Sequence, residues 1–549
     1  MNKRSLKWLL LVLVFILAAA VGCSKKSATG GDTGGTGGNG GGGGDKKEER
    51  ITLTFFMNNA GLAHPEGVDP SDNPYIKIIE DKANVDLQVE VPPYSEFQTK
   101  FNLLLSSGKL PDLLHTNYPD PTYQAARQGA FLDLKKYYDN SPIIQKWVTP
   151  QMMELAKDPV TGNYWRIPMV YDKGPMGAGI YARYDLVEKY YGGKWPESVE
   201  EWVDLLRKIK QAEPDSIPMS ARVIGDNVFP YGGGVFFRLY GAYPYEWRIM
   251  NGKVIPNVVL PEFRAAVELM RQLYAEGILD KEFATTDSNQ WFTKWNTKNV
   301  LFQWNSADQI IPGQAALMAS GTPEQKNWKY VFAPPLKKWP SVLADPKYAT
   351  PGLALPINSH GLYIPATSKD PDRAWKVIEA FASDELREAI FWGKEGVEYT
   401  VKDGKRVPNP DVLGDPNRRW VRNLALVFGY TDGQDAQNAL YELQIGQPLF
   451  GQIRDSVAQL QKQAETVGLG VIVGYTEPDE VVKKNAEIMQ AINKFTVEAI
   501  MGRITMEQFD QAVKDWEKKY RALKYDPLQK YIDEHKDYLR QMGVKMVDW

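Results

Sequence analysis

Alternating apolar and polar positions define the first folded stretch of the chain. Residues 51–56 and 85–91 repeat apolar side chains with a period of two, which is typical of half-buried strands. Residues 74–82 between them have apolar positions at helical spacing, and residues 110–115 read as a third strand. With a helix before this third strand, the order strand, helix, strand, helix, strand predicts parallel strands in an α/β lobe.

Helix-start signals place further helices. A Ser or Thr followed three residues later by Glu or Gln can satisfy two free backbone N–H groups at a helix N-terminus. Asp370 and Pro371 form another start signal, because proline fits the first helical position. The expected capping boxes are Ser95 with Gln98, Ser198 with Glu201, and Thr505 with Gln508.

A second α/β lobe is predicted further along. Residues 300–304 and 330–333 read as strands between amphipathic helices, residues 361–365 read as another strand, and the chain after Glu477 is helical. We therefore expect two α/β lobes with a helical C-terminal part packed on them. The expected divisions are 51–175 for the first part of lobe 1, 176–350 for lobe 2, 351–475 for a return to lobe 1 with cleft segments, and 476–549 for the C-terminal helices.

The N-terminus reads as an export signal that ends in a lipid anchor. Residues 1–22 combine positive charge with an apolar run over residues 8–21, which is too short for a comfortable membrane span. Small residues precede Cys23, the only cysteine, as in the lipobox cut by lipoprotein signal peptidase. The alternative is a general secretion signal beside a chance cysteine. We favour lipidation of Cys23, with residues 23–50 as a Gly-rich flexible tether.

Composition narrows the function classes. The 549 residues include 65 Lys and Arg against 68 Asp and Glu, so the chain offers no global field for nucleic acid. One cysteine and four histidines cannot supply a Cys- or His-rich zinc site. The local signatures of serine hydrolases, zinc peptidases, dithiol redox proteins and P-loop NTPases are absent from the sequence. We expect no catalytic residue, no cofactor and no metal.

Five segments spread along the chain follow the order of motifs of a known family. They are FNLLLSSGKLPDLL (101–114), GAFLDLKKYYDNSP (129–142), LYAEGILDKEF (273–283), GLYIPATSKDPDRAWKVIEAFASDE (361–385) and GKEGVEYTVKDG (393–404). Together they resemble the family 1 extracellular solute-binding proteins, and within that family the long lipoprotein branch that serves carbohydrate importers. The likeness runs over nearly all of residues 50–543, although each segment alone is weak.

The resemblance implies a two-lobed clamshell of the periplasmic binding protein type, which closes on a solute and hands it to a membrane permease. On this interpretation the protein is a monomer, anchored outside the cytoplasm by its lipid. It captures an oligosaccharide and delivers it to the permease subunits of an ABC importer, without catalysis. A surface-tethered carbohydrate-active enzyme is the alternative from another class, because two carboxylates distant in sequence leave no local signature. A peptide-binding member of the same class is a further alternative.

One turn departs from the family pattern. Where the resemblance implies a turn reading DGKIYGIP, residues 158–168 have Trp165 and Arg166 in place of Tyr and Gly. The resemblance also implies calcium near this turn in some alginate-binding relatives, held by oxygen side chains at alternate positions. Val160 interrupts such a series here, so we predict that this turn binds no calcium.

Candidate ligand contacts lie where strands end, because ligands of doubly wound lobes bind outside the carboxyl ends of strands. For the side chains after the first and third strands, ligand contact and simple turn formation are both open. For Trp304 and Asn305 we favour ligand contact, since an aromatic plane beside an amide suits a pyranose. The candidates at these strand ends are Asn58, Asn59, Tyr118, Asp120, Trp304 and Asn305.

Further candidates come from other features of the sequence. Trp165, Tyr171 and their neighbours Arg166 and Asp172 lie near an expected lobe crossing, where cleft lining and hinge packing are both open. Trp247 belongs to a dense aromatic run over residues 240–248, which favours a platform at the cleft edge. The resemblance places the segment that contains Trp392 and Glu395 close to the cleft.

Two aromatic features have a structural interpretation instead. Trp291 and Trp295 are four residues apart, which favours packing of one helix face into the core. Residues 337–348 are bounded by prolines and are expected to form a solvated loop.

Overall fold

The folded unit of the chain begins at Glu49. The computed structural model describes residues 49–171, 177–224, 226–349, 355–429, 434–467 and 474–544. The signal segment, Cys23, the tether up to residue 48 and Asp172 lie outside these ranges. A helix with the length and apolar character needed to cross a membrane is not found in the described ranges.

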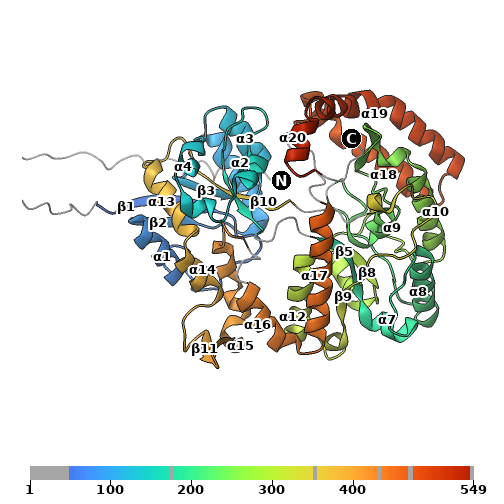
Figure 1. Cartoon of the computed structure of the whole chain (residues 1–549), viewed down its shortest axis with the longest axis horizontal. Coiled ribbons are helices and arrows are strands. Elements are labelled where there is room, and N and C mark those ends of the chain that lie inside the picture. Colours follow the sequence, from blue (N-terminus) through green and yellow to red (C-terminus); the bar gives the residue numbers. More distant parts are fainter. Residues whose placement is uncertain are drawn as a thin grey trace, which may run out of the picture. The chain divides into compact units, whose positions relative to one another are not determined.

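A five-stranded sheet forms the centre of the first lobe (Figure 1). Its strands are β1 Ile51–Met57, β2 Val85–Glu90, β3 Leu113–Thr116, β4 Ile167–Val170 and β10 Ile357–Tyr363. They lie in the order β2-β1-β3-β10-β4, with β1 parallel to β2 and β3. β10 runs antiparallel to both of its neighbours. The predicted parallel βαβ opening is therefore confirmed, and a strand from much later in the chain completes the sheet.

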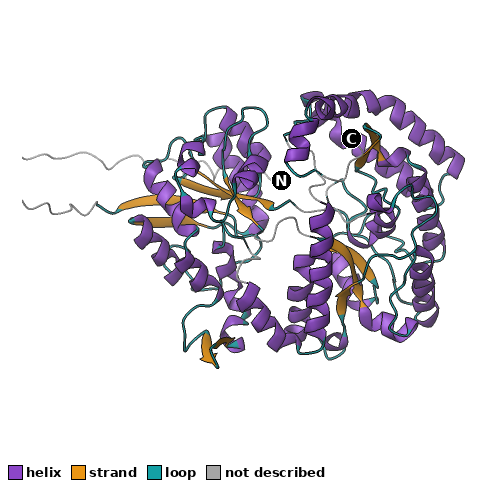
Figure 2. Ribbon diagram, viewed as in Figure 1, coloured by secondary structure: helices purple, strands orange, loops and turns teal. Residues whose placement is uncertain are grey.

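Helices and a small hairpin surround this sheet (Figure 2). α1 begins at the Asn73 cap, and α13 begins at Asp370, whose side chain accepts a bond from the Arg373 N–H at 3.0 Å. Helix α1 spans Pro74–Ala83 and helix α13 spans Pro371–Phe381. The other helices are α2 Tyr94–Ser107, α3 Pro119–Arg127, α4 Lys135–Asp139, α5 Pro142–Gln145, α6 Pro150–Ala156, α14 Asp384–Phe391, α15 Pro410–Leu413 and the 3-10 helix η6 Pro416–Leu424. The hairpin pairs β11 Tyr399–Lys402 with β12 Lys405–Pro408.

The predicted capping box at Ser95 and Gln98 is wrong. Helix α2 starts two residues earlier than predicted, at Tyr94, directly after Pro93, and it has no side-chain cap. Ser95 therefore lies inside the first turn, where its hydroxyl is not in the capping position. The helix ends at Gly108, which adopts the left-handed conformation with φ +66°.

The second lobe is built on a three-stranded antiparallel sheet in the order β8-β5-β9. Its strands are β5 Ala178–Arg183, β8 Phe302–Ser306 and β9 Tyr330–Phe332, and a separate hairpin pairs β6 Trp247–Met250 with β7 Lys253–Pro256. The predicted strand over residues 300–304 is displaced by two residues, so Trp304 lies in the middle of β8 and not at its end.

Many helices pack around the second sheet and the hairpin. Ser198 caps α8 by accepting from the Glu201 N–H at 3.2 Å, but the Glu201 carboxylate returns to the Glu197 N–H and completes only half of the expected box. The helices are α7 Tyr184–Tyr191, α8 Val199–Ala212, η1 Tyr231–Gly234, α9 Val235–Leu239, η2 Asn257–Val259, α10 Pro261–Ala275, α11 Ser288–Thr297, η3 Ala307–Gln309, α12 Ile310–Ser320, η4 Gln325–Asn327 and η5 Pro346–Ala349.

The C-terminal part is helical, as predicted. From residue 476 on, its helices are α18 Asp479–Ile500, α19 Met506–Glu534 and α20 Lys536–Gln541. Two further helices, α16 Gln434–Ile445 and α17 Leu449–Val467, precede it in the stretch 351–475. The full capping box of Thr505 and Gln508 is present at the start of α19. α17 contributes Leu460 to a second-lobe core, and α19 contributes Trp516 and Tyr520 to the main core of that lobe. The C-terminal helices therefore share the apolar interior of the second lobe.

Each lobe has its own apolar interior. One interior draws on residues 53–170 and 357–428, together with Ala436 of α16, and it belongs to the first sheet. The main interior of the second lobe draws on residues 180–336 and 488–544. The stretch 351–475 contributes to both lobes, because Ile445 and the apolar face of α17 pack with the second sheet.

Among the described residues, the chain leaves the first-lobe interior after Val170, returns to it at Ile357 and leaves it again along α16, between Ala436 and Ile445. Two backbone hydrogen bonds link the first two of these places to each other and to Val427. The Val170 N–H donates to the Val427 carbonyl at 3.1 Å, and the Tyr171 N–H donates to the Pro356 carbonyl at 2.9 Å. Gly429 has φ +75°, and a Cβ atom there would lie 2.1 Å from the Val170 oxygen. A glycine is therefore required at this contact with β4.

Candidate functional site

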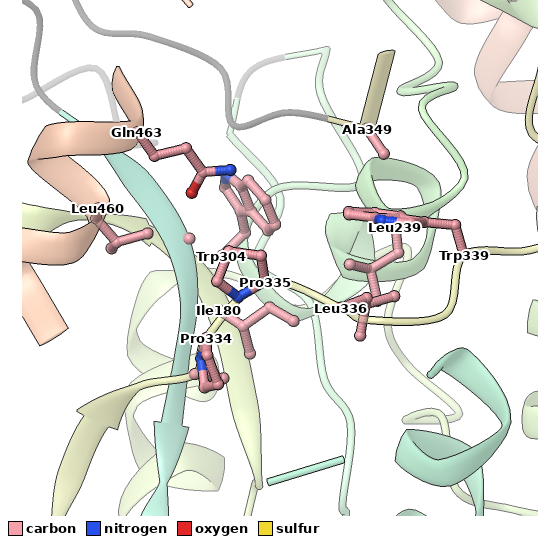
Figure 3. A pocket seen from close by; sticks show the side chains of 12 residues that line it. Ile180, Leu239, Trp304, Pro334, Pro335, Leu336, Trp339, Ala349, Leu460 and Gln463 are labelled. Atoms are coloured by element: carbon pink, nitrogen blue, oxygen red, sulfur yellow. The ribbon is translucent and has the colours of Figure 1, made fainter. Parts of the chain in front are cut away.

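A pocket opens at one edge of the second sheet, where β5 begins and β8 and β9 end (Figure 3). Its volume is about 350 Å³, part of it open to solvent. Figure 3 shows Leu460 and Gln463 reaching it from α17, with Trp304 and Trp339 among the other lining side chains. The lining residues are Gly179, Ile180, Leu239, Trp304, Ala333, Pro334, Pro335, Leu336, Trp339, Ala349, Leu460 and Gln463.

Two glycines let α17 approach this edge of the sheet. A Cβ atom on Gly177 would lie 2.7 Å from the backbone oxygen of Leu460, and one on Gly179 would lie 2.9 Å from a methyl carbon of the same leucine. The first contact is with rigid backbone, so a side chain at Gly177 would push α17 away from β5. The close approach places Leu460 and Gln463 at the pocket wall.

The lining of the pocket suits an uncharged, amphipathic molecule. None of the twelve described residues that line it carries a charged side chain. Trp304 and Trp339 are both half-buried, so part of each indole remains accessible. Gln463 adds an amide, which can both donate and accept hydrogen bonds. Flat apolar faces with one adaptable polar group match a sugar ring, whose faces are apolar and whose rim carries hydroxyl groups.

Asn58 and Asn59 form a buried turn after β1. Both side chains are buried, and their amide oxygens accept the N–H groups of Ala60 at 2.6 Å and Gly61 at 3.0 Å. The Asn58 amide also donates to the Asn117 side chain at 3.0 Å, which joins the ends of β1 and β3. The sequence left turn formation and ligand contact open for these residues. The hydrogen bonds show that they form a turn, and ligand contact by their amides stays a prediction.

Tyr118 and Asp120 stand at the end of β3, where α3 begins. The Tyr118 ring is half-buried and stacks against Phe97 at 6.2 Å and Phe101 at 5.9 Å. Asp120 is exposed in the first turn of α3. Both side chains are accessible at the carboxyl edge of the first sheet, and their contact with a ligand stays a prediction.

Trp165 and Tyr171 flank β4 but occupy different environments. Trp165 is buried in an aromatic cluster of the first lobe, and its indole N–H donates to Asp158 at 2.9 Å. Tyr171 is half-buried at the first crossing, where its hydroxyl accepts from the Asn358 amide at 2.8 Å. Trp165 therefore serves core packing, whereas Tyr171 belongs to the crossing that follows the first sheet.

Four further candidates lie apart from the pocket lining. Trp247 is half-buried in β6 and packs on the main core of the second lobe. Trp392 contacts Tyr399 edge-on at 5.4 Å and lies under the Arg406 guanidinium, and Glu395 is exposed nearby in sequence. Asn305 is half-buried, and its side-chain oxygen accepts the Ser306 N–H at 2.9 Å. Among the candidates from the sequence, the pocket includes Trp304.

Sequence reasoning missed most of the pocket wall. Trp339 lies in the stretch 337–348, which was expected to be solvated, yet it is half-buried at the pocket and Leu343 is buried in the same stretch. The tryptophan between two prolines was the available signal. Gln463 lies in a long amphipathic helix and gave no signal. The core interpretation of Trp291 and Trp295 is confirmed, since both are buried and their rings stack at 5.4 Å.

A histidine pair lies buried behind the edge of the first sheet. His360 Nδ1 and His115 Nε2 are 3.1 Å apart, so one ring nitrogen donates and the other accepts. Burial, and after it the positive charge of Arg166, lower the pKa of His360 to about 4. Burial and the neighbouring His360 also hold the pKa of His115 well below its ordinary value. Both rings are therefore neutral at pH 7.

Groups of three or more His, Cys, Asp or Glu side chains that could hold a metal ion do not occur among the described residues. The pocket presents apolar faces and one amide.

Two lobes with separate sheets and interiors, joined by three segments, define the class of two-lobed solute-binding proteins. Residues 69–388 match the bacterial extracellular solute-binding protein family, and the chain belongs to this family.

Relatives and solved structures extend this result. The chain is 24% identical to the lipoprotein LipO of Bacillus subtilis, over 84% of this chain and 88% of that protein. It is 22% identical to YtcQ of the same organism, a polygalacturonan/rhamnogalacturonan-binding protein, over 82% and 86% of the two chains. Its fold is similar to that of the Streptococcus pneumoniae ABC-transporter substrate-binding protein FusA, solved as an EF-hand mutant with fructo-nystose. That match has a TM-score of 0.62 and 18% identity, over 89% of this chain and 100% of that one.

Proposed function

We propose that the protein is an extracytoplasmic lipoprotein that captures an oligosaccharide and delivers it to an ABC importer. The observation that carries the proposal is the pocket at the edge of the second sheet, with its two accessible indoles, one amide and uncharged lining. Membership of a family of extracellular solute-binding proteins supports a binding role without catalysis. The carbohydrate-binding names of YtcQ and FusA support sugar as the class of ligand.

The proposed binding mode places sugar rings against Trp304 and Trp339. An indole face that loses its water on contact with an apolar sugar face gains roughly 25 cal/mol per Å² of buried apolar surface. Gln463 would pair with ring hydroxyls and fix their orientation. Residues of the first lobe, foremost Tyr118 and Asp120, would close on the exposed side of the ligand.

Binding is tested with a panel of oligosaccharides and with variants of the pocket. Titration calorimetry of the wild type against fructo-oligosaccharides, galacturonan fragments and peptides identifies the ligand class. Trp304→Ala and Trp339→Ala should each weaken binding of the selected sugar by about 1–3 kcal/mol, as expected for loss of a large apolar contact. Trp147→Ala, which removes a half-buried indole of the first lobe, is the control and should leave the affinity unchanged.

Three outcomes would contradict the proposal. Unchanged affinity in both folded pocket variants would remove the pocket from the binding site. Preferential binding of peptides would assign the protein to the peptide-binding alternative. Recovery of cleaved glycan, with several turnovers per protein molecule, would make it an enzyme.

The proposed anchor rests on Cys23. Replacing Cys23 by Ser removes the thiol that would receive the lipid, so we expect the variant to stay unprocessed or to be released from the membrane. Metabolic labelling with a fatty acid, followed by membrane fractionation, measures this directly. Label retained on the Cys23→Ser protein would contradict the lipobox interpretation.

A further inference from the structure

A half-buried arginine of the second lobe lacks an anionic partner. The Arg222 Nε atom is buried without a hydrogen-bond partner, and its Nη1 atom lies 3.5 Å from the Tyr231 hydroxyl, which is long for a hydrogen bond. No carboxylate of the described residues forms an ion pair with Arg222. Arg248 in the same lobe shows the usual arrangement, because it pairs with Glu262 at 2.6 Å. The positive charge of Arg222 is therefore open to an anion from outside the chain.

Aromatic rings hold this guanidinium in place. Its central carbon lies 5.5 Å from the centre of the Tyr231 ring and 5.9 Å from that of Phe292. The Tyr231 ring packs in turn against Trp291, with ring centres 5.1 Å apart. Phe292 is 50% exposed, so this surface reaches solvent. Aromatic faces attract a guanidinium but do not neutralise it, so its position is fixed while its charge stays available.

The backbone at Tyr231 is held in an unfavourable conformation. Tyr231 has φ +55°, in the left-handed region that bulky residues rarely adopt. The next residue is packed tightly, since a Cβ atom on Gly232 would lie 2.1 Å from the Ser220 oxygen and 3.2 Å from the Phe302 oxygen. The chain is thus wedged between β8 and the segment that leads to Arg222. Strain of this kind persists where the surrounding structure enforces it, and it is frequent at ligand-binding sites.

The Arg222 surface is connected to the pocket through β8 and η1. Helix η1, which begins at Tyr231, packs on β8, and β8 contains Trp304 of the pocket. Helix α9 follows η1 directly and contributes Leu239 to the pocket lining. The twelve described residues of that lining carry no charge. A carboxylate on a ligand that fills the pocket would therefore need its partner outside the lining, as Arg222 is.

We propose that Arg222 binds a carboxylate of the ligand, so that the captured oligosaccharide is an acidic one with uronic acid units. This inference rests on the proposed function. The planar fork of a guanidinium matches the two oxygens of a carboxylate, which a neutral sugar does not offer. The apolar pocket takes the face of one sugar ring, and Arg222 takes the carboxylate of another unit of the same chain.

The test compares acidic sugars with the same sugars in neutral form. Titration calorimetry of the full chain uses acidic fragments of pectin, hyaluronan and alginate, and the fragment bound best is compared with its own methyl ester. The wild type should bind the acid about tenfold more tightly than the ester, and added salt should reduce this preference. Arg222→Gln should abolish the preference and leave the affinity for the ester unchanged. Arg222→Lys, which keeps the charge without the fork, should retain part of the preference.

Arg238→Gln is the matched control. Arg238 also lies over a tyrosine ring, that of Tyr243 at 3.9 Å, but it pairs with Glu246 at 2.8 Å. Its charge is already compensated, so the variant should keep the wild-type preference for the acid. If Arg222→Gln does not fold, the wild type and Arg222→Lys decide by the same comparison.

Several results would overturn the inference. Equal binding of acid and ester by the wild type is one, and an unchanged preference in folded Arg222→Gln is another. A wild type that binds neutral fructo-oligosaccharides but none of the acidic fragments would overturn the role of Arg222 and leave the proposed function standing. A wild type that binds no sugar of either kind would overturn both.

Discussion

Two buried charges of the first lobe are compensated in different ways. Asp158 faces a guanidinium of opposite charge. Arg166 instead donates to three successive backbone carbonyls, those of Asn358, Ser359 and His360, at 2.5–3.1 Å. Backbone dipoles can satisfy a buried guanidinium because it distributes its charge over several N–H groups. These three contacts are with carbonyl groups and include no carboxylate. The positive charge of Arg166 therefore disfavours a second positive charge on the neighbouring His360 and helps to lower its pKa.

The neutral state of the histidine pair predicts an acid-sensitive first lobe. Since folding lowers the pKa of His360 from about 6.5 to about 4, the unfolded chain binds a proton in this interval that the folded chain rejects. Stability should therefore fall as the pH drops from about 6.5 to about 4, and His115 should add to this loss. Thermal midpoints measured across this range check the direction.

His360→Gln separates this effect from the titration of carboxylates. As the pH falls over the same range, the thermal midpoint of the variant should decrease less steeply than that of the wild type, although the variant is less stable at pH 7. His535→Gln, at the end of α19, is the control and should keep the wild-type slope. Equal slopes for His360→Gln and the wild type would show that the pair does not titrate in this range.

At the scale of elements, two helices with the same capping signal in their sequence differ in whether the cap forms. The spacing of Thr505 with Gln508 and that of Ser95 with Gln98 are identical, but only the first pair forms a box. Helix α2 begins at Tyr94, directly after Pro93, whose ψ of 139° is not helical. Ser95 therefore lies inside the first turn and cannot act as the N-cap.

This difference gives a paired prediction. Thr505→Ala removes the acceptor for the Gln508 N–H, which lies 3.2 Å from the hydroxyl, and should destabilise the second lobe by about 1 kcal/mol. Ser95→Ala should change the stability by less than about 0.5 kcal/mol, since alanine is the better helix former and no cap is lost. Denaturant unfolding with a resolved transition for each lobe measures both. An equal effect of the two substitutions would contradict the assignment of the caps.

Local patterns predicted elements well and predicted the pocket poorly. Strand β1, helix α1 and the Thr505 box follow from side chains within one or two turns, so a short window of sequence contains their cause. The pocket joins Trp304 and Trp339 with Gln463, which reaches it through the packing of α17 on β5. That packing depends on the missing side chain of Gly177, and no periodicity in the sequence reports a contact between residues so far apart.

At the scale of the whole molecule, function is expected to depend on movement of one lobe against the other. A ligand that touches both lobes stabilises a closed form only by its higher affinity for that form. Two of the places where the chain passes between the lobe interiors lie together, since Val170 and Tyr171 bond to Val427 and Pro356, and we expect backbone torsions near them to change in such a movement.

Small-angle scattering provides the corresponding test. The radius of gyration should decrease when the sugar selected by calorimetry saturates the wild type, and it should not change for Trp304→Ala at the same sugar concentration. A wild-type radius that stays constant at saturation would contradict closure, even if binding is confirmed.

The place of β10 in the first sheet governs the order in which the chain can fold as it is made. β10 separates β3 from β4, yet it is synthesised only after the whole of residues 177–349. When β4 leaves the ribosome, its partner β10 has not been made, whereas β5, β8 and β9 are all made before β10. The sheet of the second lobe can therefore assemble first, although its gene segment comes later. Because contacts distant in sequence form slowly, we expect the first sheet to be completed late in folding, after β10 has been made.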